Sequence, residues 1–543
     1  MPPPRGSEPQ SRGRPGWPIA VAVVAVVALV ASLTMNVVQA RRATDLREEI
    51  TALDEQVGQL EQELADAREA GEDDADDDGG AGGLLDGLLG GEGGESLDDL
   101  LGGLGGGDLG DLEGLLEGLL GGEGGSGLED LLGGLGGAGQ MELAQCAAGG
   151  PEPGSLTVPD AAAEEQIEVI AAQVEELREL SYETDVPTTF LDNDAFEQEV
   201  FERFEEDLAP EDADAEGRIL AALGVIEPGT DVRELFLDLI SGQAAGFYDT
   251  EEKEIFVKAV DPDAPLDTVT QITLAHELEH ALADQNLTFP DLDADIDADA
   301  ALANLAVIEG DAVLSQQQWM LGALSFDEQI GLAQDPLITA SQDQLAEFPH
   351  YMQSELLFPY QDGLGFICSA FNQGGWQAVN ATYDDAPSTS AEILYPDRLG
   401  EAPADTPELG APGGDWEEAR TDTIGAAQLR WLFEAPGDDT AAALEEPAAA
   451  AAAWAGGELR LWASDDDSAL GVSLAQRDGE PDLCASVTDW YAAAFPQAAD
   501  ADAQGDERLA VDGDAQSAVV SCGEDGVRLG IGPDLDVARA VAG

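Results

Sequence analysis

A low-complexity segment rich in glycine, leucine and acidic residues interrupts the chain over residues 71–140 and limits where a packed core can form. Within it, residues 83–94 (GLLDGLLGGEGG) recur almost unchanged as residues 114–125 (GLLEGLLGGEGG). Glycine this dense makes an ordered core costly in backbone entropy. We therefore expect residues 71–150 to form a disordered tether, with weak packing of the leucine pairs, on a partner or on each other, as the alternative.

A nearly continuous apolar segment occupies residues 17–40, and the next charge after it is Arg41. Its length suits a transmembrane helix. Three arginines precede it: Arg5, Arg12 and Arg14. By the positive-inside rule, residues 1–16 form a cytoplasmic tail, and the C-terminal part lies outside a cell membrane that the chain crosses once. A signal peptide cleaved near Ala40 is the alternative.

Residues 41–70 read as a polar helix between the apolar segment and the tether. Apolar side chains recur every three or four positions there: Leu46, Ile50, Leu53, Val57, Leu60 and Leu64. This spacing is typical of a coiled coil, so a homodimer through residues 43–70 is one expectation. A single solvated helix is the other.

The chain is strongly acidic, with 113 Asp and Glu against 21 Lys and Arg and a formal net charge of −92. Such a surface repels polyanions, so we exclude nucleic acid as a partner. We interpret the charge as a solubility adaptation, for example to high salt, with a cationic partner as the alternative.

The four cysteines contain no C-x-x-C pair, which argues against a cysteine-based metal site. Outside the cytoplasm they could form two disulfides, and we favour Cys484 with Cys522 because both lie in the last segment. Buried free thiols are the alternative.

The strongest chemical signal is the H-E-x-x-H motif from His276 to His280. A helix capped by Asp267 or Thr268 and running to about Asn286 carries it. Residues four apart lie on one helix face, so the two imidazoles can hold one Zn²⁺. The intervening Glu277 can act as the general base that takes a proton from water.

A third ligand is expected on the next helix, over residues 299–318. Glu309 lies on its apolar face, where a carboxylate is costly unless it is paired or binds a metal. Few cations are near in sequence, so we take Glu309 as the third zinc ligand. Asp284 and, less strongly, Asp311 are candidates for orienting the imidazoles.

With these features the sequence resembles the gluzincins, the thermolysin-like zinc peptidases. The order of elements matches: a hairpin over residues 246–258, the H-E-x-x-H helix and a second helix bearing Glu. More narrowly it resembles uncharacterised, membrane-anchored H-E-x-x-H proteins of bacteria and archaea. The matching segments are residues 246–249 (GFYD), 276–285 (HELEHALADQ), 309–312 (EGDA), 358–363 (FPYQDG) and 387–396 (PSTSAEILYP).

The resemblance implies an α+β fold, bound Zn²⁺, hydrolysis of a protein or peptide substrate, Glu277 as the base and an edge strand as the substrate platform. We expect an endopeptidase rather than an exopeptidase. The sequence departs from that group at Tyr395, where histidine is usual. Tyr395 or His350 could stabilise the oxyanion. Tyr248 and Tyr360 are weaker candidates that could be core aromatics.

These observations divide the folded part into a gluzincin-like peptidase region, residues 151–435, and a small C-terminal α+β unit, residues 436–543. A non-catalytic surface scaffold or binding module stabilised by zinc is the alternative function. An intact Glu277 argues against it, because a structural site needs only the ligands.

Overall fold

The computed structural model describes Cys146 and residues 149–543, except for residues 153, 208, 242–244, 259–263, 290–291, 293–295, 333–334, 436–443, 465–466, 498 and 524–525. The described residues belong to one compact unit. The predicted cytoplasmic tail, transmembrane helix, coiled-coil segment and nearly all of the tether lie outside them. Among the helices of the described part, none is both long and apolar enough to cross a membrane.

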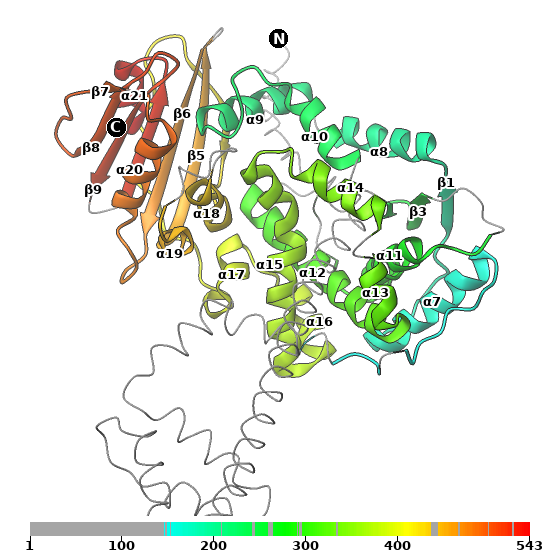
Figure 1. Cartoon of the computed structure of the whole chain (residues 1–543). Helices are drawn as coiled ribbons and strands as arrows, with labels where there is room; N and C mark the ends of the chain where they lie inside the picture. The colour runs from blue at the N-terminus through cyan, green and yellow to red at the C-terminus, as the bar shows by residue number, and fades with distance from the viewer. Residues whose placement is uncertain are drawn as a thin grey trace, which may run out of the picture. The chain divides into compact units, whose positions relative to one another are not determined.

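The described part mixes helices and sheets, as the predicted α+β class requires (Figure 1). Helices predominate in its first half. Those that precede the motif helix are α7 (Ala163–Arg178), α8 (Asn193–Asp207), α9 (Pro210–Ala222) and α10 (Val232–Ser241). The acidic first turns of α7, α8 and α9 suit the positive end of the helix dipole.

The predicted hairpin is present as β2 (Gly246–Asp249) and β3 (Glu254–Lys258), which pair antiparallel. Lys253 closes the turn with a positive φ of 56°. Strand β1 (Thr188–Leu191) adds to β3 in parallel, giving the order β1-β3-β2. Strand β2 is therefore an edge of this sheet.

Two long buried helices follow the hairpin. Helix α11 (Thr268–Asn286) begins at the N-cap Asp267, whose carboxylate accepts a hydrogen bond from the Thr270 amide. Helix α12 (Ala298–Ala323) begins in the same way at Asp297. Both helices are buried on nearly all sides, as expected for helices in the centre of a domain.

Helix α15 (His350–Gly374) packs along α12 at backbone contact (Figure 1). A Cβ atom built on Gly363 would lie 2.3 Å from the carbonyl oxygen of Ala306, and one built on Gly310 would lie 2.4 Å from the backbone of Gly363. Only glycine allows two helices to approach this closely. Shorter helices complete this region: α13 (Phe326–Leu332), α14 (Pro336–Leu345), α16 (Trp376–Asp384) and α17 (Ser390–Leu394).

A seven-stranded antiparallel sheet forms the C-terminal part, in the order β4-β5-β6-β10-β9-β8-β7. Its strands are β4 (Glu417–Asp422), β5 (Trp454–Ser464), β6 (Asp467–Gln476), β7 (Ala499–Asp500), β8 (Glu507–Asp512), β9 (Ser517–Gly523) and β10 (Gly526–Gly532). Because β4 belongs to this sheet, the sheet begins before residue 436, where we expected the C-terminal unit to start.

Helices cover both faces of this sheet. The helices are α18 (Ala426–Glu434), α19 (Pro447–Ala452), α20 (Leu483–Ala494) and α21 (Leu535–Ala542). Along β9 the side chains alternate: Val520 belongs to the main core with Trp490 of α20, and Val519 packs with Ala538 of α21. The main core also includes residues of α12 and α15, so it is continuous between the helical and the sheet regions.

Two disulfides are present. The predicted Cys484–Cys522 bond joins α20 to β9 and is confirmed. The other joins Cys368 of α15 to the fully buried Cys146. The folded part therefore includes Cys146, a residue that we expected to lie in the tether.

Candidate metal centre

Helices α11 and α12 bring together the three side chains expected to bind a metal. His276 Nε2 lies 3.1 Å from Glu309 Oε2 and 3.1 Å from His280 Nε2. His280 Nε2 lies 3.4 Å from the same Glu309 oxygen. One ligand atom from each residue fits within 4.8 Å of the others, so this buried group could hold a metal ion.

The electrostatics of this group are those of a cation site. Burial is the largest influence on the pKa of His280, but Glu309, Glu277 and Glu279 outweigh it and raise that pKa to about 9. Burial also dominates at His276, and there it lowers the pKa. The pKa of Glu309 is lowered because the two histidines outweigh the effect of its burial. Clustered carboxylates thus create a negative potential around two imidazoles.

Glu277 lies in the same buried region without belonging to the ligand set. Burial, with the negative charge of Glu309, raises the pKa of Glu277 to about 8, although the charge of His280 and a hydrogen bond from the backbone of Tyr248 oppose the shift. Tyr248 is on edge strand β2, so the hairpin and the motif helix meet at this carboxylate. Glu277 Oε2 has no hydrogen-bond partner among the described residues.

The two residues proposed to stabilise an oxyanion have their contacts elsewhere. The Tyr395 hydroxyl donates a hydrogen bond to the carbonyl oxygen of Ala448 at 3.2 Å, and its ring lies over Arg398. His350 Nε2 lies 3.1 Å from Glu434 Oε2. No contact between either residue and the metal group is present in the described part of the chain. Among the described residues neither side chain has a contact that supports an oxyanion role, and that role stays a prediction.

Tyr360, a weaker candidate from sequence, is the tyrosine that faces the metal group. Burial, followed by the charge of Glu309, a hydrogen bond to Glu309 and the charge of Glu277, raises the pKa of Tyr360 far above its usual range. The backbone contact between Gly310 and Gly363 explains this placement, because Glu309 and Tyr360 lie one and three residues from those glycines.

Asp284 and Asp311, the residues expected to orient the imidazoles, have other partners. Asp284 accepts hydrogen bonds from the Tyr248 hydroxyl at 2.7 Å and from Lys253 at 2.6 Å. Asp311 accepts hydrogen bonds from Arg178 and Tyr383. Glu279, inside the motif itself, is the carboxylate on the Nδ1 side of His280: its Oε2 lies 4.0 Å from His280 Nδ1. No sequence pattern singles out Glu279.

The site is closed in this conformation. His276, Glu277 and His280 are each 1% exposed, and Glu309 is fully buried. A cavity of about 1450 Å³ lies elsewhere, between α9, strands β4 and β5 and the residues before α12. None of the metal-group residues lines that cavity.

Searches of protein-family models, curated proteins and solved structures found no match to this chain. The function is therefore argued from the site.

Proposed function

We propose that this chain is a zinc-dependent peptidase that cleaves a protein or peptide substrate outside the cytoplasm, held at the cell membrane by residues 17–40. The observation that carries the proposal is the convergence of His276, His280 and Glu309 next to Glu277, a buried carboxylate with one oxygen that no described residue hydrogen-bonds. A site that only bound metal would have no use for that fourth group.

The donor set supports zinc as the metal. Two imidazoles and one carboxylate are a common three-ligand set of catalytic zinc, which keeps a further position for water or substrate. Among the described residues, buried Glu309 Oε1 has no hydrogen-bond partner. An unpartnered buried carboxylate oxygen is costly unless an ion or another ligand satisfies it. Bound there, zinc would polarise a peptide carbonyl and make a water molecule easier to deprotonate.

The side chains around the metal group support hydrolysis by general base catalysis. Glu277 takes a proton from the water that attacks the carbonyl carbon and gives it to the amine that leaves as the C–N bond breaks. Burial raises the pKa of Glu277. A group that acts first as a base and then as an acid needs such a raised pKa. Edge strand β2 meets Glu277 at Tyr248, so a substrate strand paired to β2 would pass the base.

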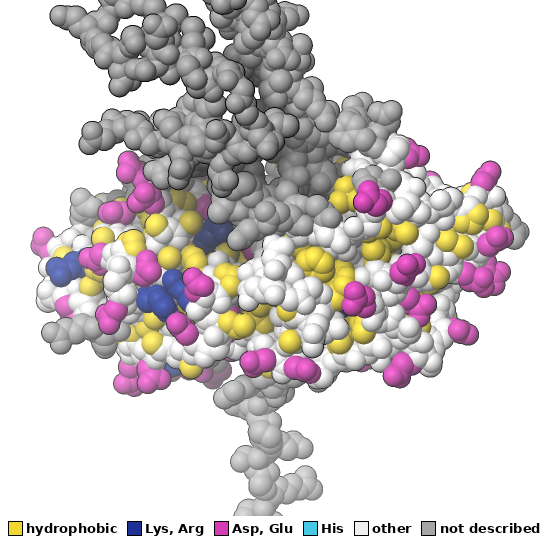
Figure 2. Space-filling model, turned by 90° about the horizontal axis from the view of Figure 1, so that it is seen from below, with side chains coloured by type: hydrophobic (Ala, Val, Ile, Leu, Met, Phe, Trp, Pro, Cys, Tyr) yellow, Lys and Arg dark blue, Asp and Glu magenta, His cyan; other side chains and the backbone are white. Residues whose placement is uncertain are grey.

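The order of hairpin, motif helix and Glu-bearing helix supports a gluzincin-like arrangement, with an endopeptidase favoured because an edge strand can bind the middle of an extended chain. The acidic surface supports the exclusion of nucleic acid as a partner. Figure 2 shows acidic side chains spread over the visible face of the described residues, with few basic ones among them.

A second candidate function is a zinc-stabilised scaffold or binding module without catalysis. The observation that favours it is the burial of all four side chains, because a structural zinc site is closed whereas a peptidase must admit its substrate. A structural zinc site has four protein ligands, whereas a catalytic one has three. The group of three ligands in the described part of this chain therefore favours the enzyme.

Replacement of the base separates the two functions. Glu277→Gln keeps the shape of the side chain and removes the proton acceptor. We expect unchanged zinc content and a loss of peptide-library hydrolysis of about a hundredfold or more. Glu251→Gln, the same change at an exposed residue of the hairpin turn, should leave both unchanged. Equal cleavage by Glu277→Gln and the parent would refute the mechanism. Zinc binding by the parent without any hydrolysis would favour the scaffold.

A further inference from the structure

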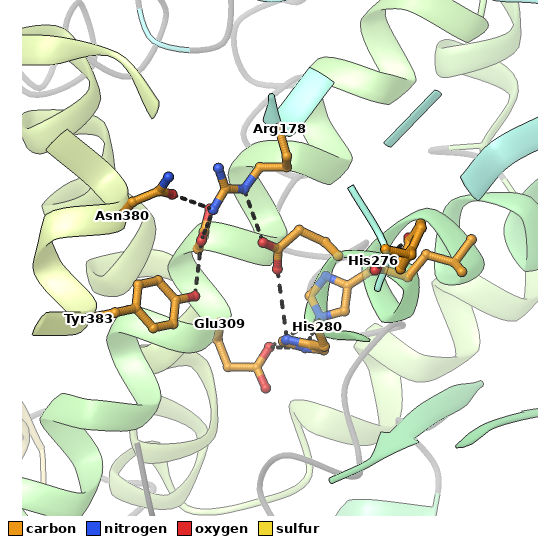
Figure 3. Close-up of polar contacts among 10 residues, drawn as sticks. Arg178, His276, His280, Glu309, Asn380 and Tyr383 are labelled. Atoms are coloured by element: carbon orange, nitrogen blue, oxygen red, sulfur yellow. Dashed lines mark hydrogen bonds and ion pairs between the residues drawn. The ribbon is translucent and has the colours of Figure 1, made fainter. Parts of the chain in front are cut away.

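A fully buried arginine links the first helix to the motif helix. Arg178 Nε donates a hydrogen bond to Glu279 Oε1 at 3.1 Å, and its Nη2 donates to Asp311 Oδ2 at 2.8 Å and to Asn380 Oδ1 at 3.0 Å (Figure 3). Tyr383 donates a further hydrogen bond to the same Asp311 oxygen at 2.9 Å. We call these five residues, Arg178, Glu279, Asp311, Asn380 and Tyr383, the arginine cluster.

The cluster fixes Glu279 and leaves one of its oxygens free. Arg178, Glu279 and Asp311 are all fully buried, so water does not share their hydrogen bonds. Oε1 of Glu279 is bound by Arg178, whereas Oε2 has no hydrogen-bond partner among the described residues. The cluster also joins four helices, because its members come from α7, α11, α12 and α16. Glu279 therefore has little freedom to turn away.

The free oxygen points toward a second unpartnered atom. His280 Nδ1 is buried, has no hydrogen-bond partner in the described part of the chain and lies 4.0 Å from Glu279 Oε2. A buried N–H and a buried carboxylate oxygen are each costly when left unpaired. Because these two atoms face one another, we expect Glu279 Oε2 and His280 Nδ1 to form a hydrogen bond when the imidazole is oriented toward the metal.

The chemistry of a metal-binding imidazole explains why His280 Nδ1 needs a hydrogen-bond acceptor. His280 presents Nε2 to the metal group, and an imidazole that binds metal through Nε2 carries its proton on Nδ1. That proton needs an acceptor, which in zinc sites is commonly a carboxylate.

The charges agree with this role. Arg178 faces two carboxylates, those of Glu279 and Asp311, so these contacts join two acidic groups to one guanidinium. A histidine bound to a divalent cation would add positive charge at the place where Glu279 meets His280.

We propose that Glu279, held by Arg178, is the positioning residue that accepts the Nδ1 proton of His280 and orients this imidazole toward the metal. The proposal rests on the proposed function only for the identity of the metal. It assigns to one glutamate of the motif a task separate from that of Glu277: Glu277 acts on the substrate, and Glu279 acts through a ligand.

The experiment uses the small number of histidines. The full chain has three, so labelling with ¹⁵N-histidine gives ring signals from His276, His280 and His350 alone. His350 lies against Glu434 and serves as the internal reference. In the zinc-loaded parent we expect the His280 ring to be protonated at Nδ1, with its proton shifted downfield by a charged acceptor. In Glu279→Gln that proton signal should move upfield, while the His350 signals stay in place.

Zinc affinity, measured by chelator competition, is the second readout. Glu279→Gln should weaken it by about tenfold to a hundredfold, as loss of such a partner commonly does. Tyr383→Phe is the matched control, because it removes one hydrogen bond of the same cluster without touching Glu279 or His280. It should lower the stability of the metal-free protein and leave zinc affinity within about threefold, well below the effect expected for Glu279.

Equal losses of zinc affinity in Glu279→Gln and Tyr383→Phe would overturn the proposal, since they would show that the cluster acts only through stability. An unprotonated His280 Nδ1 in the zinc-loaded parent would overturn it too, and this test needs no variant to fold. Neither readout uses hydrolysis. A chain that binds zinc as described but cleaves nothing would thus contradict the proposed function and leave the role of Glu279 standing.

Discussion

The contact between helices α12 and α15 predicts opposite effects for two glycines in the same helix. Alanine at Gly363 would place its Cβ 2.3 Å from the carbonyl oxygen of Ala306, whereas alanine at Gly365 would meet no atom within 4 Å. Both changes add a residue with better helix propensity. Only the change at Gly363 forces two backbones apart.

The magnitude follows from these two terms. Replacing a helical glycine by alanine stabilises a helix by up to about 1 kcal/mol. Overpacking in a well-packed core costs about 1–3 kcal/mol, and the upper end applies at Gly363 because a backbone oxygen cannot turn aside as a side chain can. We therefore expect Gly363→Ala to lower the free energy of unfolding by about 2 kcal/mol and Gly365→Ala to raise it by up to about 1 kcal/mol.

Urea unfolding followed by tryptophan fluorescence measures both variants against the parent. Gly363→Ala should also weaken zinc binding, because Gly363 holds α15, and with it Tyr360, against the helix that carries Glu309. If Gly363→Ala were as stable as Gly365→Ala, the two helices would not be in backbone contact and the explanation for the position of Tyr360 would fail.

Two further predictions concern a buried acid and the tyrosine at the metal group. Burial raises the pKa of Asp299 to about 7 from an ordinary 3.8, so its contribution to stability is present below pH 4 and is lost as pH rises toward 7. Asp299→Asn should match the parent in urea unfolding below pH 4 and exceed its stability at pH 8 by up to about 4 kcal/mol; equal stability at both pH values would contradict the shift. Tyr360→Phe removes the hydroxyl that faces Glu309 and should weaken zinc affinity, by about tenfold or less, in chelator competition; an unchanged affinity would show that the hydroxyl does not support this ligand.

Much of the site was predictable because its signals are local. The spacing of His276 and His280 depends only on helix geometry, and Asp267 is one of the two N-caps that the sequence allowed. Glu309 could be predicted because it stands on an apolar helix face that proves fully buried. The hairpin over residues 246–258 was predictable from a local signal too, because strand-like residues flank a polar turn.

The parts that the sequence analysis missed depend on contacts between distant segments. Tyr360 faces Glu309 only because two glycines bring α12 and α15 together, although its spacing of three residues from Gly363 was a usable signal. Glu279 meets an arginine 101 residues earlier in the chain, a pairing that no local pattern reveals. Strand β4 was overlooked because its side chains are polar and largely exposed, as suits an edge strand.

The zinc content of the purified full chain, compared with that of Glu309→Ala and Glu277→Gln, is the most direct test of the metal centre. The arrangement of the three ligands predicts stoichiometric zinc in the parent and in Glu277→Gln, and strong loss in Glu309→Ala, because that variant removes a ligand while the other leaves the ligand set intact. Full zinc content in a folded Glu309→Ala, or a parent chain that takes up no zinc, would contradict the assignment of His276, His280 and Glu309 as the metal centre.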